Sequence, residues 1–137
     1  RGTTDVAFLE RAYQTMSRVL AEEWGRRDAE LPLRTPYDAL ILASIVEKET
    51  GKAGERGKIA GVFIRRLRKG MKLQTDPTVI YGMGDDFEGN IRRRDLKQDP
   101  PYNPYVHAGL PPTPISMPGA AAIRAVLHPA PGKSLSL

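Results

Sequence analysis

The sequence contains no cysteine, a single tryptophan and two histidines among its 137 residues. The lack of cysteine excludes disulfide bonds, thiolate nucleophiles and zinc sites with sulfur ligands, but it does not fix the compartment. His107 and His128 lie too far apart in the sequence to form a pair on one helix, so we predict no metal site. No apolar run reaches the ~18 residues that a membrane-spanning helix needs.

The composition is that of a globular protein. Hydrophobic residues make up 40% of the chain and charged residues 27%, and the length suits one domain. The net charge of +5 suggests an anionic partner such as nucleic acid, anionic lipid or an acidic polymer. Much of the excess lies in residues 65–69 and 92–94, which could equally form a solvated helix face and a basic loop.

Hydrophobic spacing and capping residues predict a mainly α fold, α+β at most. We expect helices over residues 4–27, 36–50, 54–69 and 118–127, the first with a packed face of Val6, Leu9, Tyr13, Met16, Val19 and Leu20. The second begins at a clear signal, because Thr35 can cap it and Pro36 suits its first position. From Gly70 to Pro118 the chain is rich in proline and glycine, which is typical of binding or active-site loops. A short strand pair is expected near Leu73.

Glu49 is the carboxylate that stands out in the second predicted helix. Leu42, Ile45 and Val46 form an apolar stripe, and Glu49 continues it at the i+7 position. Partial burial and the negative end of the helix dipole both raise the pKa of a carboxyl group, which suits a general acid. Alternatively, Glu49 reaches solvent or pairs with a lysine or an arginine. Glu47 is expected to be a surface partner for a lysine.

The loop region carries a second set of chemical groups. Residues 74–78 read Gln-Thr-Asp-Pro-Thr and residues 102–105 read Tyr-Asn-Pro-Tyr, with residues 109–112 and 115–118 following as further proline-containing motifs. Aromatic, amide and hydroxyl side chains in a stiff loop suit a carbohydrate, because sugars present apolar faces and directed hydroxyl groups. A packed structural loop explains the tyrosines equally well, and helix capping alone would explain Asp76.

These motifs together resemble those of a known family. Residues 43–50 (ASIVEKET), 62–67 (VFIRRL), 73–82 (LQTDPTVIYG), 102–105 (YNPY), 109–112 (GLPP) and 128–130 (HPA) closely resemble, in order, the YceG-like family of endolytic murein transglycosylases. The resemblance covers about residues 4–131. Glu49-Thr50 also looks like the Glu-Ser signature of other lysozyme-like transglycosylases, which favours Glu49 over Glu47.

The resemblance implies an activity, a fold and a location. It implies cleavage of the MurNAc-β-1,4-GlcNAc bond within peptidoglycan strands, leaving 1,6-anhydroMurNAc ends, by a lysozyme-like helical scaffold in the periplasm. We expect residues 1–137 to form a single catalytic domain, with the inner-membrane anchor and a preceding small domain absent from the fragment. Family members usually continue after residues 128–130 with an aromatic, strand-like stretch, from which residues 132–137 (GKSLSL) depart.

The resemblance also implies the site residues. We predict Glu49 as the acid–base residue, with substrate-binding groups at Thr50, Gln74, Thr75, Asp76, Tyr81, Asn103, Tyr105 and Ser116. Asp76 could contact substrate, stabilise charge or cap a helix. No cofactor and no metal are expected, and Glu49 would act twice, first as acid and then as base. Peptidoglycan strands are the expected partner, peptidoglycan synthases are candidate partners, and nucleic acid is not expected.

Three other functions are compatible with some of these features. A muramidase-type hydrolase would keep the groove and let water attack, and a non-catalytic glycan-binding domain would keep the groove alone. A basic nucleic-acid-binding module would bind in a salt-sensitive way and be indifferent to Glu49, and it leaves residues 102–105 unexplained.

Overall fold

The computed structural model describes residues 2–77 and 108–137, with side chains from residue 6 onward. Its helices are α1 (Gly2–Gly25), α2 (Pro36–Glu49), α3 (Ala53–Arg68) and α6 (Ala120–Leu127). The predicted mainly α fold is confirmed, and each helix begins and ends within two residues of its expected bounds. A strand pair was expected near Leu73. Within the described residues, the structure has there a single antiparallel bridge between Lys72 and Ala108.

The start of α2 follows the expected capping chemistry. The Thr35 hydroxyl accepts a hydrogen bond from the Asp38 N–H at 3.2 Å, and Pro36 occupies the first turn. The Asp38 carboxylate in turn accepts from the Arg34 N–H at 3.0 Å. The first bond satisfies a backbone donor that a helix start leaves free, and the second ties the residue before the cap to the first turn, so both hold α2 at the end opposite Glu49.

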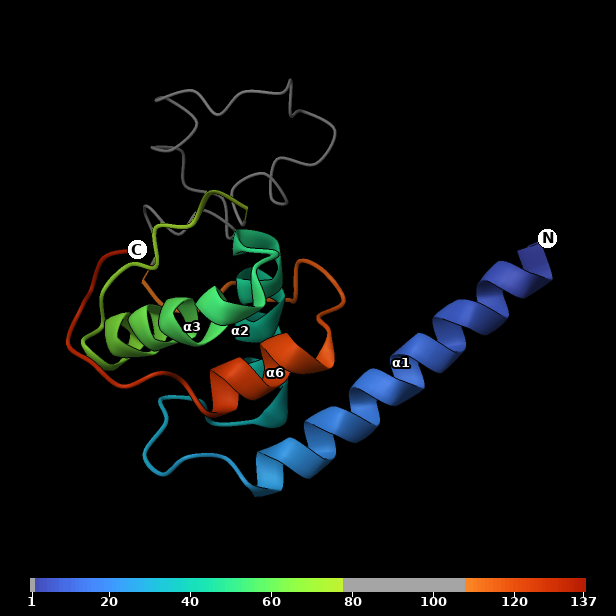
Figure 1. Cartoon of the computed structure of the whole chain (residues 1–137), viewed down its shortest axis with the longest axis horizontal. Helices are drawn as coiled ribbons and strands as arrows, with labels where there is room; N and C mark the ends of the chain where they lie inside the picture. Colours follow the sequence, from blue (N-terminus) through green and yellow to red (C-terminus); the bar gives the residue numbers. More distant parts are fainter. Residues whose placement is uncertain (1, 78–107) are drawn as a thin grey trace.

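The core lies where α6 packs against α1, α2 and α3 (Figure 1). Its largest fully buried side chains include Leu42, Ile45, Phe63, Ile64, Leu73, Ile123 and Leu127. The predicted stripe on α2 was too narrow, because residues 41–46 are all buried. The helices α1, α3 and α6 all contact α2. The loop before α6 contacts it too, because the Ser44 hydroxyl accepts a hydrogen bond from the Ile115 N–H while it donates to the Ile41 carbonyl of its own helix.

The predicted packing face of α1 is wrong for its first half. Met16 and Val19 are buried, but Val6, Leu9 and Tyr13 are 54%, 56% and 59% exposed. Figure 1 shows the reason, since this half of α1 extends away from the other helices. Within the described residues, no helix combines the length and the apolar character needed to cross a membrane.

Candidate active site

Glu49 is the last residue of α2 and makes a direct contact with the segment that follows α3. The Thr75 hydroxyl donates a hydrogen bond of 2.9 Å to the Glu49 Oε2 atom. Thr75 is 1% exposed, whereas Glu49 is half-buried. The expected alternatives, in which Glu49 pairs with a lysine or an arginine, are not seen among the ion pairs of the described residues. The carboxylate is therefore oriented by a neutral donor.

The segment that carries Thr75 alternates between buried and exposed side chains. Leu73 and Thr75 point inward, while Gln74 and Asp76 are exposed. The backbone of Gln74 has a φ of 57°, in the left-handed region that non-glycine residues rarely adopt. Helical geometry begins at Asp76, directly after Thr75, as expected for a capping position. Gln74 and Asp76 flank Thr75, which contacts Glu49, and the substrate-binding role of each stays a prediction.

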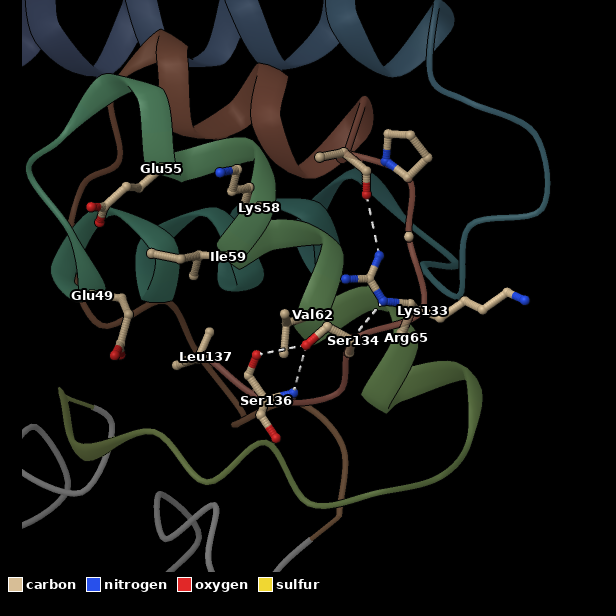
Figure 2. Close-up of a pocket in the computed structure, with 13 residues that line it drawn as sticks. Glu49, Glu55, Lys58, Ile59, Val62, Arg65, Lys133, Ser134, Ser136 and Leu137 are labelled. Atoms are coloured by element: carbon tan, nitrogen blue, oxygen red, sulfur yellow. Dashed lines mark hydrogen bonds between the residues drawn. The ribbon is translucent and has the colours of Figure 1, made fainter.

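Glu49 lines a pocket of about 690 Å³ on one side of α3 (Figure 2). Three apolar side chains, those of Ile59, Val62 and Leu137, line it and lie between Glu49 and Arg65 in this view. Lys58, Arg65 and Lys133 add positive charge, Ser134 and Ser136 add hydroxyl groups, and Glu55 adds a second carboxylate. The pocket has the size and the mixed polarity of ligand sites in general.

Residues 130–137 form one wall of this pocket, a feature that the sequence reasoning missed. Arg65 donates from Nε to the Ser134 carbonyl at 2.7 Å and from Nη1 to the Ala130 carbonyl at 3.2 Å. The Ala130 N–H donates to the Gly57 carbonyl at 3.0 Å. At Gly61 a Cβ atom would lie 2.5 Å from the Ala130 carbonyl oxygen, so glycine allows the segment to lie directly on α3.

The basic run at residues 65–69 is divided between contacts within the chain and exposed positions. Arg66 is 7% exposed and donates to the carbonyls of Leu135, at 2.8 Å, and of Leu73. Two of its arginines, Arg65 and Arg66, thus bind backbone carbonyls of this chain, and the suggested anionic partner stays a prediction. Arg68 and Lys69 are exposed, and the residues 92–94 lie outside the described part of the chain.

Thr50 closes the link between α2 and α3. Its N–H donates to the Val46 carbonyl at 3.2 Å, while its hydroxyl donates to Glu55 at 3.3 Å and accepts from the Lys52 N–H at 3.0 Å. Glu55 lies 3.9 Å from the Lys52 ammonium group. Thr50 follows Glu49 in the sequence, but its hydroxyl already bonds to Lys52 and Glu55 in the turn between α2 and α3. Its substrate-binding role stays a prediction.

Glu47 was expected to pair with a lysine, and this was wrong. Its Oε1 atom accepts a hydrogen bond of 2.7 Å from the N–H of Gly119, the residue that caps α6, and its Oε2 atom lies 3.9 Å from Arg56. A carboxylate at a helix N-terminus is stabilised by the free N–H groups and by the helix dipole. Glu47 therefore joins α2 to α6 and takes no part in the Glu49 pocket.

Ser116 lies away from Glu49. Its hydroxyl donates to the Ser44 carbonyl at 3.1 Å, and it borders a different hollow between α1 and α2. Tyr81, Asn103 and Tyr105 lie outside the described residues. Of the predicted site residues with a described position, Glu49 and Thr75 are in contact, Gln74 and Asp76 flank Thr75, and Thr50 follows Glu49.

The described residues contain no group of three or more histidine, cysteine, aspartate or glutamate side chains arranged to hold a metal ion. His128 follows α6, where its ring nitrogens lie 2.9 Å from Asp28 and 3.4 Å from Glu23. These carboxylates account for its position as a link between α6 and the end of α1.

The fold and the site define a helical domain that presents one oriented carboxylate at a helix end, in a pocket of mixed polarity. The chain belongs to the YceG-like family, whose model matches residues 1–135. This agrees with the motif order of residues 43–82.

Two similar proteins carry the name endolytic murein transglycosylase. The one from Bacillus subtilis strain 168 is 46% identical over 93 residues, which is 68% of this chain and 26% of that protein. The one from Streptococcus pneumoniae serotype 2 strain D39 is 36% identical over 98 residues, covering 69% of this chain and 18% of that protein. The chain therefore spans about a quarter or less of the length of these relatives.

A crystal structure of a yceG-like protein from Listeria monocytogenes has a similar fold. It aligns with a TM-score of 0.68 and 42% sequence identity over 74% of this chain and 33% of that one.

Proposed function

We propose that this chain is the catalytic part of an endolytic peptidoglycan lytic transglycosylase, a lyase that cleaves the MurNAc-β-1,4-GlcNAc bond within glycan strands. The observation that carries the proposal is the Glu49 carboxylate, held by the buried Thr75 hydroxyl at 2.9 Å at the edge of the 690 Å³ pocket. The names of the two relatives support the substrate class. The endolytic activity of the whole protein is part of the same proposal.

In the proposed reaction Glu49 acts first as an acid and then as a base. The protonated carboxyl gives its proton to the glycosidic oxygen as the bond to C1 of the muramic residue breaks, and the acetamido group of that residue stabilises C1. The Glu49 carboxylate then removes the proton from the C6 hydroxyl, whose oxygen bonds to C1 and closes the 1,6-anhydro ring. The proton returns to Glu49, and no water is consumed.

The pocket suits this substrate chemically. The apolar side chains of Ile59, Val62 and Leu137 offer contact for the flat faces of sugar rings, and the hydroxyls of Ser134 and Ser136 lie at the same wall. Thr75 stabilises the carboxylate form of Glu49 that exists between the two proton transfers. Thr50, Gln74, Asp76, Tyr81, Asn103 and Tyr105 remain proposed substrate contacts. Ser116 is not part of this proposal, because it borders a different hollow.

Product chemistry tests the proposal against hydrolysis. Glu55 is a second carboxylate in the pocket, and glycosidases normally use two, which is the observation that favours a muramidase-type hydrolase. We expect purified peptidoglycan treated with the protein to release muropeptides that lack one water relative to hydrolysis products, measured by mass spectrometry. Reducing ends alone would establish the hydrolase instead, and an unchanged polymer would leave a glycan-binding domain.

Thr75→Val tests the contact to Glu49 directly. Valine fills nearly the same space but cannot donate, and a hydrogen bond to a charged group contributes about 1.5–3 kcal/mol, so we expect kcat to fall about 10- to 100-fold. Initial rates of anhydro-muropeptide release measure it. Thr75→Ser keeps the hydroxyl and is expected to stay near the unmodified protein. A Thr75→Val protein with unchanged kcat would remove this hydrogen bond from the mechanism.

The same proposal places the protein in the bacterial cell envelope, since its substrate is the peptidoglycan named in the murein transglycosylase relatives. We propose a periplasmic catalytic domain in a parent protein that is anchored in the inner membrane and terminates nascent strands beside peptidoglycan synthases. Fractionation of cells that produce the complete protein, followed by crosslinking, tests the anchor and the synthase contact.

A further inference from the structure

Arg66 connects two segments that are far apart in the sequence. It lies in α3 with 7% of its surface exposed, and its Nε and Nη1 atoms donate to the carbonyls of Leu135 and Leu73. A guanidinium group offers several N–H donors in a fixed plane, which allows one side chain to hold two carbonyls at once. Breaking the bond to Leu73 would leave a buried donor and a buried carbonyl without a partner, which is costly, while the bond to Leu135 is part-buried.

Both segments lead to the pocket. Leu73 is fully buried and lies two residues before Thr75, which contacts Glu49. Leu135 lies between Ser134 and Ser136, which line the pocket wall. Arg66 itself is not among the residues that line this pocket, so its influence on the site passes through the backbone that it holds.

We propose that Arg66 is a positioning residue of this site: by holding the Leu73 and Leu135 carbonyls it places the Thr75 hydroxyl against Glu49 and fixes the wall formed by residues 130–137. The effect on rate rests on the proposed function. The effect on structure does not, because the two hydrogen bonds exist whatever the pocket binds.

Neighbouring arginines of α3 provide matched controls. Arg65 holds only the wall, through the Ser134 and Ala130 carbonyls, and it also lines the pocket. Arg68 is exposed and donates to the Glu30 carbonyl at 3.4 Å, on a side of α3 remote from Glu49. Arg66→Met therefore removes the hydrogen bonds to both segments, Arg65→Met removes hydrogen bonds to residues 130–137 alone, and Arg68→Met removes neither set.

A double-mutant cycle with Thr75 tests the proposal. In the complete protein, we expect Arg66→Met to lower kcat about 10-fold, and the Arg66→Met, Thr75→Val pair to fall no further than Thr75→Val alone, because both changes disturb the same hydrogen bond. Arg65→Met is expected to raise KM more than it lowers kcat, and Arg68→Met to leave both near the original values. All assays are run well below each variant's melting temperature.

Two results would overturn the proposal: an Arg66→Met protein with unchanged kcat, or a pair whose loss of kcat equals the product of the two single losses, as expected of independent sites. If Arg66→Met does not fold, Arg66→Lys enters the same cycle, since an ammonium group cannot hold both carbonyls in one plane.

Hydrogen exchange separates this proposal from the proposed function. Arg66→Met should speed amide exchange at residues 73–75 and 134–136, and Arg65→Met at residues 134–136 alone. If the unmodified protein releases no anhydro products, the proposed function is wrong. The exchange pattern would still decide the role of Arg66. Unchanged exchange at residues 73–75 in Arg66→Met would refute that role even in an active enzyme.

Discussion

Glu49→Gln is expected to lower the release of anhydro-muropeptides by about 10²- to 10⁴-fold, the range that a general acid–base residue contributes. Glutamine has the same shape and can still accept the hydrogen bond from Thr75, which is 2.9 Å long in the structure. It carries no proton that it can give to the glycosidic oxygen, and it cannot remove the proton from the C6 hydroxyl. Both steps of the proposed reaction are therefore lost together, while the fold is kept.

Glu47→Gln is the matched control for this experiment. Glu47 lies two positions earlier on α2, and glutamine keeps an oxygen to accept the N–H of Gly119. We expect its rate to stay within about twofold of the original, because Glu47 does not line the pocket that holds Glu49. Equal activity of Glu49→Gln and the unmodified protein, read as product masses, would remove Glu49 from the mechanism.

The helices could be predicted well because their signals are local. Thr35 and Pro36 mark the start of α2 through bonds to the next few residues, and Gly70 follows the end of α3 with a φ of 69°. Glu49 could be singled out for the same reason, since its place at i+7 from Leu42 is a property of one helix. Its partner Thr75 became a candidate through motif order, and the structure then placed the two side chains in contact.

Contacts between distant segments could not be predicted, because their acceptors are backbone carbonyls that no side chain identifies. The run at residues 65–69 has the same composition whether it faces solvent, an anionic polymer or the chain itself. Arg65 and Arg66 of this run donate to the carbonyls of Leu73, Ala130, Ser134 and Leu135, which become visible only once the chain is folded around α3. Glu47 was misjudged for a similar reason, since the N–H that it binds comes from the start of α6.

The first half of α1 shows the opposite error. Its apolar residues repeat at helical spacing, which predicts an amphipathic helix and is correct as far as the helix goes. Periodicity says nothing about what covers the apolar face. Val6 and Leu9 are more than half exposed in the structure because this part of α1 extends past the other helices.

Phe63→Ala is expected to cost about 3–5 kcal/mol of unfolding free energy, the usual range for removing a large aromatic side chain from a core. Phe63 is fully buried in the core cluster that joins α3 to α2 and α6. A cavity there removes contacts from the helices that carry both Glu49 and Arg66. Because single domains are stable by roughly 5–15 kcal/mol, the variant should melt far below the original protein.

Leu9→Ala is the control that separates burial from mere hydrophobicity. Leu9 belongs to the same kind of apolar spacing, but it is 56% exposed on the projecting half of α1. We expect a change within about 0.5 kcal/mol, as for most surface substitutions, measured by urea denaturation of both variants under the same conditions. A loss at Leu9 as large as that at Phe63 would mean that α1 packs along its whole length, and the exposed face described above would then be wrong.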